Sequence, residues 1–111
     1  MRTPIQTTIV TFAALTVSFL LMAAPQSVST IIEYFDKAET RPEYERSFYM
    51  KDGEEMLHGI ETFWFQNGGV EGKSNYKDGI QHGESSWHYR NGDVRWSCIF
   101  DKGRLIEGKY F

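Results

Sequence analysis

The sequence has a single cysteine, Cys98, among 111 residues, and it has no cluster of lysine and arginine. One cysteine cannot form a disulfide within the chain, so the sequence excludes a disulfide scaffold and a multi-cysteine metal site. The longest charged stretch, residues 39–46, mixes both signs, and the formal net charge is −3. Because nucleic acids and anionic membranes attract clustered positive charge, this composition argues against nucleic acid and does not favour lipid as a partner.

Glycine and aromatic residues are plentiful by contrast, with 10 glycines, only 3 prolines and an aromatic fraction of 15%. Aromatic side chains favour strands, and glycines favour the tight turns that join them. A chain of this length has room for one domain at most. The composition therefore predicts a small all-β domain.

The first 29 residues have the pattern of a secretion signal. A cationic start, Met1-Arg2, precedes an apolar run from Ile9 to Ala24, which is shorter than the roughly 20 residues that a comfortable transmembrane helix needs. Small residues at 27–29 offer a cleavage site, which would leave a mature chain from about Thr30. We expect a signal helix and export to the periplasm or the extracellular space. The alternative is an uncleaved signal that anchors the protein in the membrane.

A pattern recurs along the chain at an offset of 24 residues. The matching positions are Phe63 and Trp87, Phe65 and Tyr89, Asn67-Gly68 and Asn91-Gly92, Val70 and Val94, Tyr76 and Phe100, and His58-Gly59 and His82-Gly83. The sequence therefore predicts tandem copies of one short structural unit.

Each unit contains turn signals between apolar-rich runs. The repeat turns are Asn67-Gly68, Asp78-Gly79 and Asn91-Gly92, with related signals at Asp52-Gly53 and Lys102-Gly103. Asn-Gly and Asp-Gly favour type I′ hairpin turns, in which both central residues have positive φ. The spacing leaves strands of ordinary length, so we expect a single antiparallel β-meander.

A two-residue turn at Asn91-Gly92 would fix the register of its hairpin. The expected pairs are Arg90 with Asp93, Tyr89 with Val94, and Trp87 with Trp96. This register pairs opposite charges and gathers the large residues on one face, whereas a slip of one residue would lose both.

These residues resemble the MORN-repeat variant family, which includes YwqK-like antitoxin components of toxin–antitoxin systems. The resemblance rests on Asn67-Gly68, Tyr76-Lys77-Asp78-Gly79, His82-Gly83, Trp87-His88-Tyr89 and Asn91-Gly92. Residues 33–37 and 44–49 are similar to the lead-in strands of exported bacterial members. The resemblance implies lead-in strands at residues 30–50, about two and a half hairpin units at residues 51–111, and a binding or scaffolding role.

The aromatic side chains of the units form a candidate partner-binding face. Its members are Phe63, Phe65, Tyr76, Trp87, Tyr89, Trp96 and Phe100. In a single-layer sheet these side chains can form the thin core of the sheet. They can also remain partly exposed and bind a partner, and the two interpretations are compatible.

No residues suggest catalysis, a cofactor or a metal. His58 and His82 belong to the repeated pattern, and His88 is expected on the face opposite its aromatic neighbours. Cys98 alternates with Trp96 and Phe100, which indicates a small core residue rather than a nucleophile with a base. We therefore do not expect an enzyme.

The leading expectation is an exported, non-catalytic module that binds another protein. An antitoxin or immunity-like protein that neutralises one specific partner is an alternative, and peripheral lipid binding is another. The terminal strand, residues 108–111, could also pair with a second copy of the chain.

Overall fold

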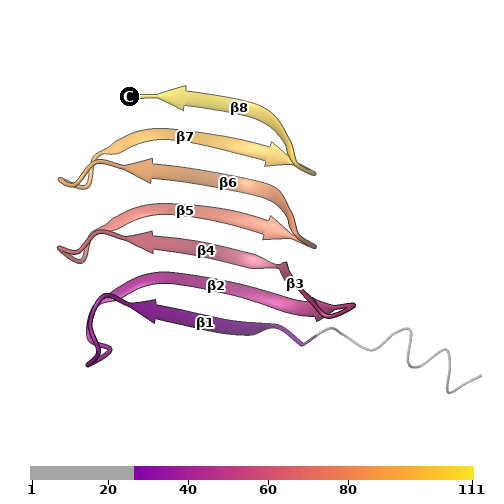
Figure 1. The fold of residues 1–111 in the computed structure, drawn as a ribbon. Helices are drawn as coiled ribbons and strands as arrows, with labels where there is room; N and C mark the ends of the chain where they lie inside the picture. Colours follow the sequence, from indigo (N-terminus) through magenta and orange to yellow (C-terminus); the bar gives the residue numbers. More distant parts are fainter. Residues whose placement is uncertain (1–26) are drawn as a thin grey trace, which may run out of the picture.

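The computed structural model describes residues 27–111, and the predicted signal helix lies outside them. The described residues form eight strands and no helix, and therefore no helix that could cross a membrane (Figure 1). The strands are β1 (Ser29–Tyr34), β2 (Pro42–Lys51), β3 (Glu54–Leu57), β4 (Gly59–Trp64), β5 (Val70–Lys77), β6 (Ile80–His88), β7 (Val94–Asp101) and β8 (Arg104–Tyr110).

The strands form one open antiparallel sheet, which confirms the predicted all-β fold class. Its order is β1-β2-β4-β5-β6-β7-β8, so neighbours in space are neighbours in the chain, and the short β3 pairs with one end of β2 (Figure 1). The lead-in segment contributes β1 and β2 to this same sheet. No second layer of the described residues covers either face.

Two-residue turns close three of the hairpins in the predicted way. Asp52, Asp78 and Lys102 each have φ of 52°, and the glycine that follows each of them also has positive φ. Positive φ at both central residues is the signature of a type I′ turn, whose twist matches that of the flanking strands. The type I′ prediction is confirmed at Asp52-Gly53 and Asp78-Gly79, and the turn signal at Lys102-Gly103 forms the same kind of turn.

The type I′ prediction is wrong at Asn67 and Asn91, because only the glycines after them have positive φ, at 93° and 97°. In the second of these loops Gly92 N donates to Tyr89 O, and Tyr89 N donates to Asp93 O. This is a three-residue loop, a type I turn followed by a left-handed glycine. Asn91 Oδ1 accepts a hydrogen bond from Asp93 N at 2.9 Å, which holds the loop without positive φ at the asparagine.

The longer loop changes the register near the turn but not farther along the strands. Trp87 lies opposite Trp96, as predicted. A bulge after Trp87 places Val94 opposite His88, so the expected pairs of Tyr89 with Val94 and of Arg90 with Asp93 are wrong. Arg90 lies inside the loop instead.

The buried residues of the sheet are mostly small. Ser74, Ser85 and Cys98 lie side by side on β5, β6 and β7, and each is 3–4% exposed. The Oγ atoms of the two serines lie 2.8 Å apart, and Ser85 Oγ also donates to Lys73 O. These bonds satisfy hydroxyl groups that would otherwise be costly to bury. We call Ser74, Ser85 and Cys98 the central row.

The two histidines of the repeated pattern join two of the type I′ turns, at Asp78 and Lys102, to the preceding strands. His58 Nδ1 accepts a hydrogen bond from Asp78 N at 3.1 Å, and His82 Nδ1 accepts one from Lys102 N at the same distance. The glycine N–H of each turn donates to a carbonyl one residue before the histidine. Both turn amides are therefore paired, and the bonds require the Nε2-protonated form of each ring.

Candidate partner-binding groove

A row of aromatic side chains crosses the sheet on the same face as the central row. Its members are Tyr44, Phe63, Trp87, Trp96 and Tyr110, from β2, β4, β6, β7 and β8. The ring centroids are 4.7 Å apart for Tyr44 and Phe63, 5.5 Å for Phe63 and Trp87, and 6.3 Å for Trp96 and Tyr110. These three spacings lie in the range of favourable aromatic pairs. Trp87 and Trp96 lie opposite each other in the sheet, so the row crosses five strands.

Gly72 makes this row possible because it lies between Phe63 and Trp87 on β5. The Trp87 ring covers Gly72, and a Cβ atom at position 72 would lie only 2.4 Å from Trp87 Cε3. The missing side chain lets Trp87 reach across β5 and stack on Phe63. Gly72 thus joins the aromatic residues of two hairpins.

Tyr76 and Phe100 lie on the other side of the central row from Phe63, Trp87 and Trp96. Between these two sets of aromatic side chains lies an open groove of about 470 Å³. Its lining consists of Glu61, Phe63, Ser74, Tyr76, Gln81, Trp87, Arg95, Trp96 and Phe100. Of the central row only Ser74 lines the groove, and aromatic residues lie on both sides of it.

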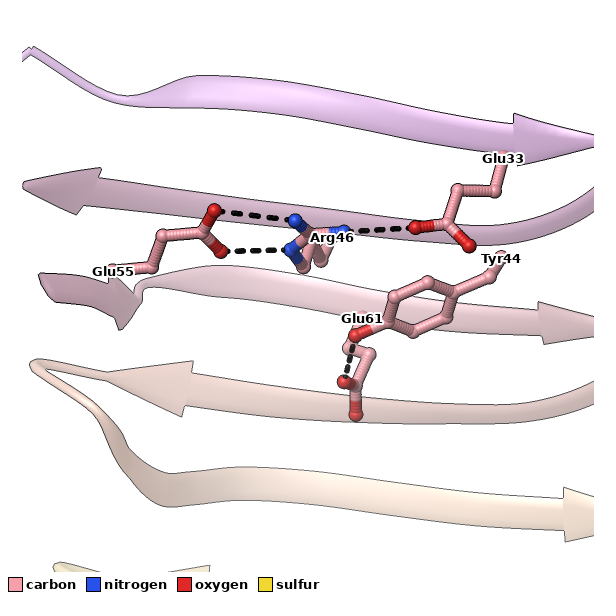
Figure 2. Close-up of polar contacts among 5 residues, drawn as sticks. All are labelled: Glu33, Tyr44, Arg46, Glu55 and Glu61. Atoms are coloured by element: carbon pink, nitrogen blue, oxygen red, sulfur yellow. Dashed lines mark hydrogen bonds and ion pairs between the residues drawn. The ribbon is translucent and has the colours of Figure 1, made fainter.

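Glu61 places a carboxylate at one end of this groove, opposite Ser74 of the central row. Tyr44 Oη donates a hydrogen bond of 2.5 Å to Glu61 Oε2 (Figure 2). Burial first, and then the bond to Glu61, raise the pKa of the Tyr44 phenol well above its usual value. Burial and the nearby Glu61 also raise the pKa of Tyr76. Both phenols therefore remain protonated beside the carboxylate at neutral pH.

Arg46 lies beside this end of the groove but is engaged elsewhere. Its Nε and Nη2 atoms bind the two oxygens of Glu55 at 2.9 and 3.2 Å, and its Nη1 lies 3.4 Å from Glu33 Oε2 (Figure 2). The same guanidinium lies 5.8 Å from the Tyr44 ring centroid and 5.6 Å from that of Phe48. Arg46 thus binds two carboxylates between two aromatic rings, and it makes no ion pair with Glu61.

The structure brings five of the seven predicted face residues together in the groove. These are Phe63, Tyr76, Trp87, Trp96 and Phe100. Phe65 and Tyr89 lie at the hairpin ends instead. The Arg90 guanidinium lies 5.7 Å from the Phe65 ring centroid, and Tyr89 is 46% exposed. Neither residue lines the groove, because the bulges before the loops separate them from the aromatic row.

Sequence reasoning missed Glu61 and Tyr44. Glu61 precedes Phe63 by two residues, and this spacing on a strand places both on one face. This spacing could therefore have identified Glu61 as a residue of the aromatic face. Tyr44 belongs to the lead-in segment, whose place in the sheet the repeated pattern does not define.

Other reactive side chains of the described residues offer no second site. Residues 27–111 contain no group of three or more His, Cys, Asp or Glu that could hold a metal ion. Cys98 is buried, and burial raises the pKa of its thiol. His88 Nδ1 is buried without a hydrogen-bond partner in the described part of the chain, on the strand position after Trp87.

Comparison of the chain with protein-family models, with curated proteins and with solved structures finds no match.

Proposed function

We propose that this protein is an exported, non-catalytic module of MORN-type hairpin repeats that binds another protein through its aromatic groove. The N-terminal sequence pattern supports export, and the 24-residue offset supports the repeat assignment. The resemblance described above supports a binding role over an enzymatic one.

The single observation that carries the proposal is the open aromatic groove on an uncovered sheet face. Phe63, Trp87 and Trp96 border a hollow of about 470 Å³ that no other described element covers. Tryptophan and tyrosine contribute most to binding when a partner buries them in a central, dry patch. A rigid sheet also loses little conformational freedom on binding, so the groove is organised in advance.

The test is capture of a partner by the full chain, carrying a C-terminal tag and recovered after export. Trp96→Ala removes one border of the groove, whereas Trp64→Ala removes the remaining tryptophan, whose β4 position follows Phe63 and faces the opposite side. We expect one dominant envelope protein that binds the parent and Trp64→Ala but is lost with Trp96→Ala. Circular dichroism of each variant checks the fold. Equal capture by both variants would contradict the groove as the binding site.

The captured protein also separates the two binding roles. A partner whose toxic activity stops on addition of the chain would identify an immunity-like function, and a partner without such activity would identify a scaffold. Binding to anionic vesicles without any captured protein would refute a protein partner.

A further inference from the structure

The surroundings of Arg46 show how this sheet holds a guanidinium group. Two nitrogen atoms of Arg46 bind both oxygens of Glu55, and the rings of Tyr44 and Phe48 lie within 6 Å of the charged carbon. A flat guanidinium suits such a place because it binds a carboxylate through two bonds and stacks on aromatic rings at once.

The neighbouring groove holds the same components, but no cation is paired with its carboxylate. Glu61 provides the carboxylate, and Phe63 and Tyr76 line the groove beside it. Tyr44 Oη binds Glu61 Oε2, which fixes the carboxylate in place. Figure 2 shows Glu61 directed away from the Arg46 cluster.

No cation of the described residues neutralises Glu61. Within residues 27–111 the ion pairs of arginine and lysine join Arg46 to Glu33 and Glu55, so none of them includes Glu61. Arg95 also lines the groove, but it lies on β7, and β5 and β6 separate it from Glu61 on β4. A partner that enters the groove would therefore cover an unpaired carboxylate, which is costly unless the partner brings a positive charge.

We propose that the groove takes an arginine side chain from its protein partner, with the guanidinium bound to Glu61 and stacked on the neighbouring aromatic rings. This inference rests on the proposed function and names the chemistry of the partner. The net charge of −3 adds a general attraction toward a basic segment.

Arginine fits better than lysine at this position. Tyr44 already binds one oxygen of Glu61, so the incoming group must use the remaining lone pairs while it lies against aromatic rings. A lysine ammonium is compact and strongly hydrated, and it cannot stack as a planar group. We therefore expect a peptide that contains arginine to bind more tightly than the same peptide with lysine in place of arginine.

The direct test uses the short peptide acetyl-Gly-Gly-Arg-Gly-Gly-amide as the probe and the full chain as the receptor. The neutral control peptide carries citrulline, which has nearly the shape of arginine. Nuclear magnetic resonance follows the indole N–H signals of Trp87 and Trp96, which line the groove, and uses Trp64 as an internal reference. We expect the arginine peptide to shift the first two signals and to bind at least ~10-fold more tightly than the citrulline peptide.

Two glutamate variants locate the charge that recognises the probe. Glu61→Gln keeps the side-chain shape and should abolish the preference for arginine over citrulline. Glu84→Gln is the matched control, because Glu84 is exposed and does not line the groove. Equal binding of the two peptides to the parent chain, or an unchanged preference in Glu61→Gln, would overturn the arginine assignment.

Capture of the partner by the Trp96→Ala and Glu61→Gln variants distinguishes failure of the arginine inference from failure of the proposed function. Loss of the partner with Trp96→Ala but full retention with Glu61→Gln would leave the groove as a protein-binding site and refute the arginine. Retention with both variants would refute the groove itself. We expect the partner to bind Glu61→Gln at least ~10-fold more weakly than the parent chain. We also expect this weaker binding to depend less on salt concentration.

Discussion

Trp87 covers Gly72 so closely that a Cβ atom at position 72 would lie 2.4 Å from the Trp87 ring. This contact connects the aromatic residues of two hairpins, since Trp87 stacks on Phe63 across β5. We expect Gly72→Ala to displace the indole and to lower the free energy of unfolding by about 1–3 kcal/mol, as overpacking does elsewhere. Urea denaturation measures the change.

Gly108→Ala is the matched control, because a Cβ atom there would lie 3.9 Å from Cys98 Cβ, an ordinary contact. Both glycines lie in strands without positive φ. If the two substitutions changed stability equally, the contact with Trp87 would not explain the glycine at position 72.

His82 stabilises the turn of the last hairpin by accepting a hydrogen bond from Lys102 N. Replacement of His82 by alanine leaves this amide to water, so we expect a loss of about 0.5–1.5 kcal/mol. Amide hydrogen exchange should accelerate at Lys102 and remain unchanged at Asp78, whose amide is bound by His58. Gln81→Ala is the control, because the main-chain carbonyl of Gln81 still accepts from Gly103 N. Unchanged exchange at Lys102 in His82→Ala would exclude this role.

Tyr44 should make the protein sensitive to alkaline pH. Burial and Glu61 raise the pKa of its phenol above the ordinary 10.0, so the folded chain holds this proton more tightly than the unfolded chain. The associated stability is complete below pH 10 and falls as the pH rises above that value, because only the unfolded chain ionises there. We expect Tyr44→Phe to lose less stability than the parent between pH 9 and pH 11, measured by urea denaturation.

Tyr110→Phe is the control for this alkaline effect, since Tyr110 is 83% exposed. Its loss of stability over the same pH range should match that of the parent. An identical pH dependence in Tyr44→Phe and the parent would show that the Tyr44–Glu61 bond does not affect stability.

Cys98 should react slowly with thiol reagents in the native protein. The residue is 4% exposed, and burial raises the pKa of its thiol, so the reactive thiolate is both scarce and covered. We expect Ellman's reagent to react at least ~100-fold faster in urea than in the native state. Arg95→Cys in a Cys98→Ser chain provides an exposed thiol on the same strand for comparison. Fast reaction of native Cys98 would contradict its burial.

The sequence by itself determined the strand composition and three of the turns. Asp52-Gly53, Asp78-Gly79 and Lys102-Gly103 form type I′ turns because local steric preferences at positive φ decide such turns. The predicted pairing of Trp87 with Trp96 is also observed, although it was derived from a two-residue turn, because the bulge between Val94 and Trp96 compensates for the extra loop residue.

Local preference did not decide the two Asn-Gly loops. A two-residue and a three-residue loop both suit Asn-Gly, and Asn91 Oδ1 favours the longer one by accepting from Asp93 N. The extra residue produces a bulge, which removed Phe65 and Tyr89 from the predicted face.

Only the tertiary structure decided the composition of the groove. Tyr44 meets Glu61 across 17 residues of chain, and Trp87 reaches Phe63 because Gly72 has no side chain. Such contacts depend on which strands become neighbours and on the space between their side chains, and neither is a property of a local sequence window. The sequence contained the glutamate and the aromatic residues, and the packing of the sheet joined them into one candidate site.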